Sequence, residues 1–280
     1  MKRILAPISL VACLSAQVLS GASAAVITNG LGGTAGFGEN TLSANDDNSS
    51  PQIDLTSIFA GGLNFFGTTY NSLYVNNNGN VTFDSNQGTF TPFVLTGATS
   101  NPILAPYFAD VDTRGGSTTA TPGGNSTGSN LVYWDLDSST NTFTATWDDV
   151  GYFSSSTSLL NSFQLAIIDQ GAGDFDIEFR YEDINWTTGN ASGGSNGLGG
   201  TVARAGWSAG NGINFQEIGA SGDQSAMLNL ENTSNVGTAG LYRFEVRNGA
   251  VAPSPIPEPS SLFALAIGLF ALANRKKFMK

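Results

Sequence analysis

The chain of 280 residues contains no histidine, and its only cysteine is Cys13. Without histidine, a Ser-His-Asp triad, a Cys-His pair and a zinc-histidine site cannot be built. If the segment that carries Cys13 is removed, the rest of the chain can form no disulfide and has no thiol nucleophile. Any catalysis would therefore have to depend on carboxylates.

Positive charge is also scarce in the body of the chain. Between residues 26 and 250 there are five arginines, no lysine and twenty-one carboxylates, which gives a net charge of −16. The remaining basic residues lie near the two ends. Such a body repels phosphate backbones, so we expect no nucleic-acid partner. Cations or neutral glycans are electrostatically easier partners.

The N-terminal segment has a basic start, an apolar middle and small residues at its close. The triplet Ala22-Ser23-Ala24 is an A-x-A site, which predicts a signal peptide over residues 1–24 and cleavage between Ala24 and Ala25. A rival processing site is the lipoprotein-like box that ends at Cys13, which would carry a lipid. Export is implied by either site.

The C-terminal segment is apolar on every face from Leu262 to Ala273 and is followed by Arg275, Lys276 and Lys277. Without a polar stripe, such a helix is not suited to docking on a soluble core. It is short for a membrane span, which needs about 20 apolar residues, so we expect a thin or temporary span. The basic cluster would keep the C-terminus in the cytoplasm and the body on the far side of the membrane.

The C-terminal segment also carries a resemblance. Pro257-Glu258-Pro259, then two serines, the apolar helix and the basic cluster together resemble the PEP-CTERM sorting signal. The resemblance implies a Gram-negative bacterium that makes exopolysaccharide. It further implies an exosortase that recognises the tail after transient inner-membrane insertion and releases the body to the cell surface or matrix. The alternative is a plain C-terminal anchor. We place the signal at residues 257–280 and a linker at 249–256.

The body, residues 25–248, is dominated by a period of two. Phe143, Ala145 and Trp147 share one face of a predicted strand, and residues 175–181 alternate in the same way. This alternation is typical of half-buried strands, and the more apolar 161–169 is expected to be a central strand. No capped helical pattern of about twelve residues occurs in the body. We predict an all-β fold, an antiparallel β-sandwich.

Turn residues separate the predicted strands. Asn78-Gly79 supplies the positive φ angles of a hairpin turn, so the asparagines of residues 76–80 are interpreted as turn residues rather than ligands. Residues 170–174 predict another hairpin turn. Two long Gly/Ser-rich loops, residues 114–130 and 187–201, lack apolar anchors and are expected to be mobile.

Several stretches of the body resemble, in order, segments of the NIDO domain, the extracellular domain of nidogen, alpha-tectorin and some mucins. The match runs from about residue 66 to residue 246. Its segments are residues 70–83 (YNSLYVNNNGNVTF), 103–113 (ILAPYFADVDT), 161–165 (NSFQL), 177–186 (IEFRYEDINW) and 234–244.

This second resemblance implies an extracellular matrix or adhesion module with no catalytic role. Unlike the family, the body has no cysteine, and no accessory adhesion module follows it. We therefore expect a non-enzymatic, exported protein with a structural or adhesive role in the exopolysaccharide matrix. Its expected partners are the exosortase, extracellular polysaccharide and matrix or adhesion proteins.

The pair Asp110-Val111-Asp112 is the main candidate metal site. In an extended segment both carboxylates point to one side and could share Ca²⁺ through hard oxygen ligands. Further ligands would be needed, for which Asp148 or Asp149 are the candidates. The alternative is a strand that ends in an Asx-type turn without a metal.

Two other functions stay open. Trp186 and Trp207 adjoin the long loops and could form a ligand face, which favours a carbohydrate-binding module assisted by calcium. Trp147 is expected in the core. A glycoside hydrolase needs only two carboxylates and is the second alternative. Its candidate residues are Asp110, Asp112, Asp135, Asp137, Asp148, Asp149, Asp176 and Glu178.

Overall fold

The computed structural model describes residues 27–252. The predicted signal peptide, the A-x-A site, Cys13, the PEP residues and the basic tail lie outside these residues. Among the residues that are described, no helix is long and apolar enough to cross a membrane.

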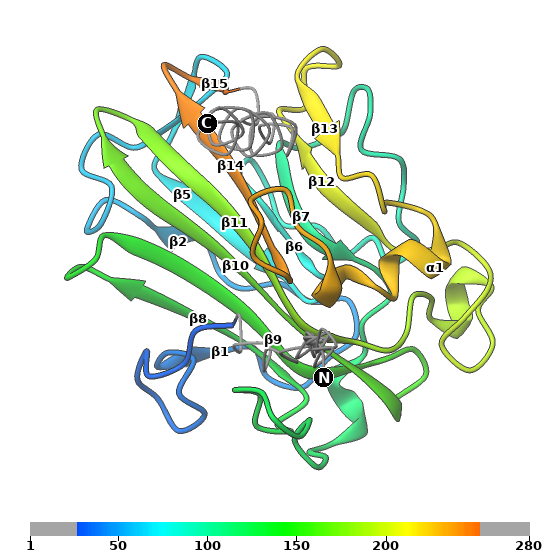
Figure 1. The fold of residues 1–280 in the computed structure, drawn as a ribbon. Helices are drawn as coiled ribbons and strands as arrows, with labels where there is room; N and C mark the ends of the chain where they lie inside the picture. The colour runs from blue at the N-terminus through cyan, green and yellow to red at the C-terminus, as the bar shows by residue number, and fades with distance from the viewer. Residues whose placement is uncertain (1–26, 253–280) are drawn as a thin grey trace, which may run out of the picture.

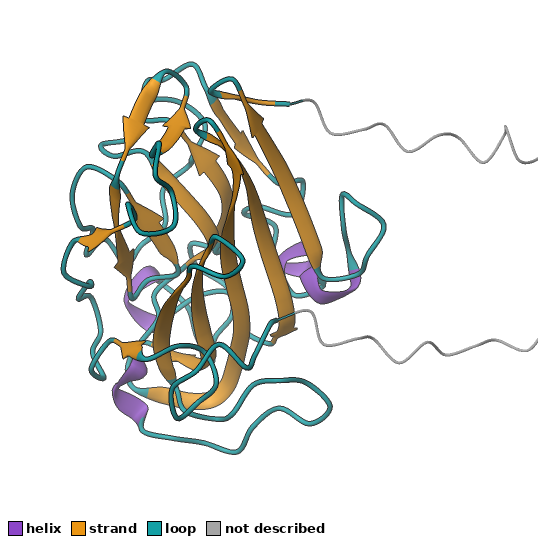
Figure 2. Cartoon of the chain, turned by 90° about the vertical axis from the view of Figure 1, so that its left-hand side faces the viewer, coloured by secondary structure: helices purple, strands orange, loops and turns teal. Residues whose placement is uncertain are grey.

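Two antiparallel sheets face each other in two layers, which confirms the predicted β-sandwich (Figures 1 and 2). In spatial order, the seven-stranded sheet consists of β1 (Asn40–Thr41), β8 (Leu131–Asp137), β9 (Thr142–Tyr152), β10 (Ser156–Gly171), β11 (Asp174–Ile184), β14 (Leu241–Arg247) and β15 (Ala250–Val251). The six-stranded sheet consists of β13 (Phe215–Glu217), β12 (Arg204–Ser208), β7 (Ile103–Phe108), β6 (Asn80–Thr82), β5 (Ser72–Asn76) and β2 (Ile53–Asp54).

The remaining described elements are short. A two-stranded sheet pairs β3 (Leu63–Phe65) with β4 (Thr68–Tyr70). The helices among residues 27–252 are α1 (Gln224–Met227), η1 (Thr113–Gly115), η2 (Asn190–Ser192) and η3 (Leu230–Asn232). β15 extends the large sheet beyond the predicted domain end at residue 248, because Ala250 and Val251 pair with β14.

The alternating apolar residues predicted from the sequence form the inner faces of the sheets. Phe175, Ile177 and Phe179 on β11 are buried, and β11 pairs with the central strand β10 as expected. The other face is less open to water than the pattern predicts, because Thr144 and Thr146 on β9 are buried too. Thr28 covers this face through Gln164, which lies on the neighbouring strand β10 and pairs with Thr146. The N–H of Thr28 donates to Gln164 Oε1 at 3.0 Å, and the carbonyl of Thr28 accepts from Gln164 Nε2 at 2.9 Å.

Aromatic residues fill the space between the sheets. Trp147 is fully buried, as expected, and its ring stacks on Phe163 at 5.0 Å between centroids. Its indole N–H donates to the Asn77 carbonyl at 2.9 Å. Because a buried indole N–H needs an acceptor, this bond ties the β5–β6 turn to the opposite sheet.

Candidate metal centre and adjoining pocket

The Asp110-Val111-Asp112 segment continues from the end of β7 towards η1. Val111 is buried between the two carboxylates, and its N–H donates to the side-chain oxygen of Asn78 at 2.9 Å. Both aspartates are almost completely shielded from solvent, with 1 % of Asp110 and 0 % of Asp112 exposed. Buried carboxylates need opposite charges or donors around them, so their partners decide what each can do.

Asp112 is satisfied by protein donors. Its Oδ1 accepts from the backbone N–H and Nε of Arg114 at 3.0 and 2.8 Å. Its Oδ2 accepts from Arg114 Nη2 at 2.6 Å and from the Ser155 N–H at 2.7 Å. Burial opposes ionisation, but these bonds outweigh it and hold the pKa of Asp112 below its usual value. Asp112 is thus the N-cap of η1 and an ion-pair partner, which corresponds to the Asx-type turn considered as the alternative.

Asp110 has a different environment. Its Oδ2 is buried and has no hydrogen-bond partner among the described residues. Burial, followed by the like charges of Asp46, Asp47 and Asp112, raises the pKa of Asp110 to about 7, with the backbone of Ala191 opposing the rise only in part. Gly189 packs so closely that a Cβ at this position would lie 2.3 Å from Asp110 Oδ2.

Asp46 and Asp47 come from the loop between β1 and β2. One carboxylate oxygen from each of them and one from Asp110 all lie within 4.8 Å of one another. Asp46 Oδ2 accepts from Arg114 Nη2 at 3.0 Å, whereas Asp46 Oδ1 is buried and has no partner in the described part of the chain. Burial and the neighbouring aspartates raise the pKa of Asp46 to about 6, against the lowering effect of Arg114. The structure therefore brings Asp110 together with Asp46 and Asp47, and the carboxylate of Asp112 faces Arg114 instead.

The asparagines of the β5–β6 turn position this loop. Asn77 Nδ2 donates to the Asp46 carbonyl at 2.5 Å and to the Val111 carbonyl at 2.7 Å. Asn78 Nδ2 donates to Asp47 Oδ1 at 2.8 Å. These asparagines form the predicted turn, but their buried side chains also join three segments that are distant in sequence. The sequence signal for Asp46 and Asp47, two adjacent carboxylates in a polar loop, gives no indication of their distance from Asp110.

The other acidic candidates belong to separate networks. Asp148 Oδ1 accepts from the Thr127 N–H and Asp149 Oδ2 from the Gly128 N–H, both at 2.8 Å, so these carboxylates hold the 114–130 loop rather than joining Asp110. Glu178 lies between Arg180 and Arg243. Asp176 pairs with Arg247. Asp135 and Asp137 both lie on β8, and Asp137 accepts from the hydroxyls of Ser139 and Thr140.

The two tryptophans expected on a ligand face are buried. Trp186 is inaccessible to solvent, and its indole N–H donates to the Val150 carbonyl at 3.0 Å. Trp207 is 4 % exposed and stacks on Phe66. Trp186 therefore cannot stack on a sugar at the surface, and Trp207 reaches solvent only slightly, at a cavity that it lines together with Phe66. The expectation was wrong about exposure because proximity to a polar loop does not determine which way a ring points.

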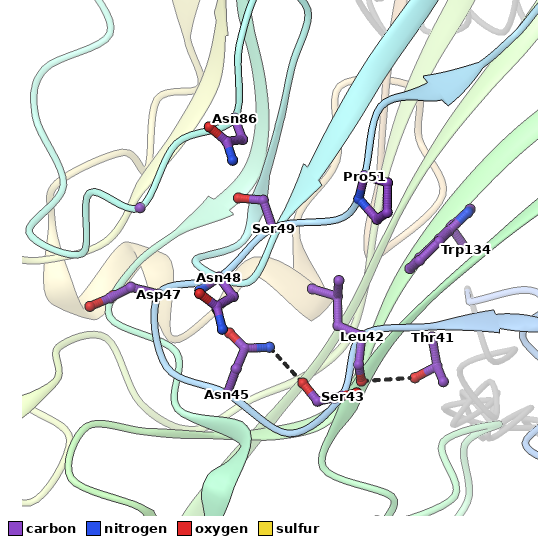
Figure 3. A pocket seen from close by; sticks show the side chains of 11 residues that line it. Thr41, Leu42, Ser43, Asn45, Asp47, Asn48, Ser49, Pro51, Asn86 and Trp134 are labelled. Atoms are coloured by element: carbon purple, nitrogen blue, oxygen red, sulfur yellow. Dashed lines mark hydrogen bonds between the residues drawn. The ribbon is translucent and has the colours of Figure 1, made fainter.

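A cavity of about 430 Å³ adjoins the acidic residues. Figure 3 shows Leu42, Pro51 and Trp134 at one side of it, with asparagines and serines around them. Asp47 contributes to the lining, but its carboxylate points away from Trp134 (Figure 3). The full lining is Thr41, Leu42, Ser43, Asn45, Asp47, Asn48, Ser49, Pro51, Asn86, Gly88 and Trp134. An apolar wall with amide and hydroxyl groups is suited to a neutral polar ligand.

Two family models match different parts of the chain. A nidogen-like domain model matches residues 71–248, and a PEP-CTERM protein-sorting motif matches residues 255–277. The two matches follow each other without overlap. They confirm both resemblances that the sequence motifs indicated.

Curated relatives match over the body. Chicken (Gallus gallus) alpha-tectorin is 35 % identical over 222 residues, which is 75 % of this chain and 10 % of that protein. Human alpha-tectorin is 36 % identical over 223 residues, and Drosophila melanogaster nidogen is 33 % identical over 201 residues, 66 % of this chain and 14 % of that protein. The match thus spans only about a tenth of the alpha-tectorins. No solved structure matches the chain significantly.

Proposed function

The chain belongs to the nidogen-like domain family, and we propose that it is a structural or adhesive protein of the extracellular matrix, sorted by an exosortase. Its sorting motif classes it as an exported protein of the cell surface or surroundings. The observation that carries the proposal is the order of the two matches. The nidogen-like domain ends at residue 248 and the sorting motif begins at residue 255, so a cut in the tail would release the whole β-sandwich.

The sorting part of the proposal follows from the chemistry of the two ends. The N-terminal signal would start export, and the short apolar segment before Arg275, Lys276 and Lys277 would hold the chain in the inner membrane until cleavage. Once released, the acidic β-sandwich would meet polysaccharide or matrix proteins outside the cell. We expect it to act there by binding and packing.

Sorting can be tested in a Gram-negative host that encodes an exosortase. We expect the wild-type chain to yield a shortened body in the medium and matrix. The variant with Pro257→Ala, Glu258→Ala and Pro259→Ala should accumulate at full length in the membrane fraction, because the recognition motif is lost. Immunoblotting of fractions and mass spectrometry of the released C-terminus measure both outcomes.

Pro253→Ala is the matched control, since it also removes a proline near the motif but leaves Pro257-Glu258-Pro259 intact. It should be processed like the wild type. Unchanged release of the triple variant, or unchanged release from a host that lacks the exosortase, would contradict the proposed sorting.

A non-enzymatic role fits the side chains available. The chain has no histidine, and the described residues contain no cysteine. Of the candidate carboxylates, Asp112, Asp148, Asp149 and Glu178 each accept several bonds from protein donors. Such carboxylates hold loops and arginines in place. New reducing ends after incubation with the host polysaccharide would restore the hydrolase as the better interpretation.

Carbohydrate binding is the second candidate function, and the cavity beside Trp134 favours it. Asn48 and Asn86 are exposed, line this cavity and could donate to sugar hydroxyls. If the cavity binds the host polysaccharide, the Asn48→Ala, Asn86→Ala double variant should lose about tenfold in affinity, as two hydrogen bonds of roughly 0.7 kcal/mol each would be removed. Retention on a column of the native polysaccharide measures this loss.

Asn29→Ala provides the matched control, because Asn29 is exposed and is absent from the lining of this cavity. Its retention should equal that of the wild type. If the wild-type chain is not retained at all, the carbohydrate-binding candidate fails and the structural role is the better interpretation.

A further inference from the structure

Three carboxylates from two distant segments converge at one end of the β-sandwich. Asp46 and Asp47 lie before β2, and Asp110 follows β7. The oxygens that they offer are within 4.8 Å of one another. Oxygens that each lie about 2.4 Å from a shared Ca²⁺ can be at most about 4.8 Å apart, so the spacing fits a common ion.

A second observation points to a ligand at this place. Asp110 is 1 % exposed, and its Oδ2 has no partner within residues 27–252. Asp46 Oδ1 is likewise buried and unpaired. A buried charged oxygen without a donor is costly, and native proteins satisfy such atoms with a proton, a water or an ion.

The protein donors leave one oxygen of Asp46 and one of Asp47 available. Arg114 donates to Asp46 Oδ2 and Asn78 donates to Asp47 Oδ1, while Asp110 Oδ2 has no donor among the described residues. Donors that hold one oxygen orient the carboxylate and direct the other oxygen to a ligand, as in known metal sites. The asparagine turn fixes the loop that carries Asp46 and Asp47, which makes the arrangement preorganised.

Charge and ligand type define the ion. When ionised, the four neighbouring carboxylates of Asp46, Asp47, Asp110 and Asp112 carry four negative charges. The guanidinium of Arg114, which pairs with Asp46 and Asp112, offsets one of them and leaves an excess of three. All available ligand atoms are oxygens. Hard divalent cations prefer oxygen ligands, and Ca²⁺ accepts irregular geometry with water completing the shell, whereas Mg²⁺ demands a near-ideal octahedron.

We propose that Asp46, Asp47 and Asp110 bind a Ca²⁺ ion that fastens the loop before β2 to the segment after β7. Asp112 supports the site through Arg114, which it shares with Asp46. The proposal does not depend on the matrix role or on sorting, because it concerns the folded body alone. Its test therefore reads out the stability of the protein and requires neither polysaccharide nor exosortase.

The test compares the melting temperature of the purified full-length chain in EDTA and in excess calcium. Since an ion that binds only the folded state stabilises it, calcium at about a hundred times its Kd should raise the Tm by about 5–10 °C. Isothermal titration calorimetry should give one calcium per chain. No shift in Tm together with no binding heat overturns the proposal.

Two variants locate the ion. Asp110→Asn should abolish the calcium response, and in EDTA it should melt at or above the wild-type temperature, because it removes a buried charge that faces like charges. Asp47→Asn, at a partly exposed position, should weaken binding at least tenfold. It keeps the test decisive if Asp110→Asn fails to fold.

Asp84→Asn is the matched control, because Asp84 is exposed and is not one of the converging residues. It should retain the full calcium response. A full response in both Asp110→Asn and Asp47→Asn would overturn the assignment of the site. An equal Tm shift with magnesium would overturn the assignment to calcium.

Discussion

Glu178 and Asp110 are both buried carboxylates, but Glu178 lies between positively charged arginines whereas Asp110 lies among negatively charged aspartates. Glu178 forms ion pairs with Arg180 and Arg243 on the outer face of the large sheet. Burial opposes its ionisation, yet the two arginines outweigh burial and lower the pKa of Glu178. Around Asp110 the neighbouring aspartates add to the effect of burial and raise the pKa. A buried acid is therefore a structural ion-pair partner or a candidate ligand according to what surrounds it.

The pKa of Glu178 gives a prediction about stability and pH. Because its folded-state pKa lies below its unfolded value, its stabilisation is complete above the unfolded pKa and is lost as the pH falls through the folded pKa. We expect Glu178→Gln to lower the free energy of unfolding by about 2 kcal/mol at neutral pH, discounted for the partial exposure of Arg243. Urea unfolding from pH 7 down to pH 3 should show the difference shrinking below about pH 4.5.

Glu245→Gln is the control for this prediction. Glu245 is half exposed and lies 3.8 Å from Arg247, so its removal should cost less than about 0.5 kcal/mol. Arg247 also pairs with Asp176 at 2.7 Å, and neither of these two residues is substituted in either variant. A loss for Glu178→Gln that stays constant across the whole pH range would contradict the ion-pair explanation.

At the scale of elements, the 114–130 loop shows how a polar segment without apolar anchors can be fixed. Thr118 donates its N–H to the Gly128 carbonyl at 2.6 Å, which closes the loop on itself. Thr121 donates to Asp149 or Asp183, each at 2.9 Å. The N–H groups of Asn125 and Ser126 donate to Glu182 at 2.7 and 2.8 Å. The anchors are thus carboxylates on β9 and β11, which the composition of the loop does not indicate.

These anchors predict the effect of a mild substitution. Thr121→Val keeps the shape of the side chain but removes its hydroxyl donor, so Asp149 and Asp183 lose a partner. We expect a loss of about 1–2 kcal/mol in the free energy of unfolding and faster cleavage of the loop by subtilisin. Limited proteolysis with mass spectrometry locates the cut.

Thr119→Val serves as the matched control in the same loop, because Thr119 is exposed and its side chain forms no hydrogen bond with any residue from 27 to 252. It should be cleaved at the wild-type rate. Equal cleavage of the two variants would mean that the hydroxyl of Thr121 does not hold the loop.

At the scale of the whole molecule, charge and hydrophobicity are divided between the body and the ends. The whole chain has a net charge of −11, whereas residues 26–250 carry −16. If both ends are removed as proposed, the released β-sandwich becomes more acidic than its precursor. A strongly acidic surface keeps such a domain soluble and attracts cations. This charge balance agrees with a role among cations and neutral polymers.

The sequence by itself determined the strands and the order of the parts. Alternation in β9, β10 and β11 and the Asn78-Gly79 turn are local signals, so they predicted strands, a hairpin and an all-β fold. The motifs at residues 70–83 and 257–259 identified both family matches. These features could be predicted because a strand period or a turn depends on residues within a few positions of one another.

The tertiary structure alone decided which residues meet and which are exposed. The outer face of β9 is covered by the segment around Thr28, and Trp186 turns into the core although it adjoins a polar loop. Asp110 meets Asp46 and Asp47, more than sixty residues away, and Asp112 turns to Arg114. Such contacts depend on how the two sheets pack and how the asparagine turn holds the loop before β2. No local pattern contains this long-range geometry, so the sequence could not predict the burial of Trp186, the cover over the outer face of β9 or the convergence of Asp110 with Asp46 and Asp47.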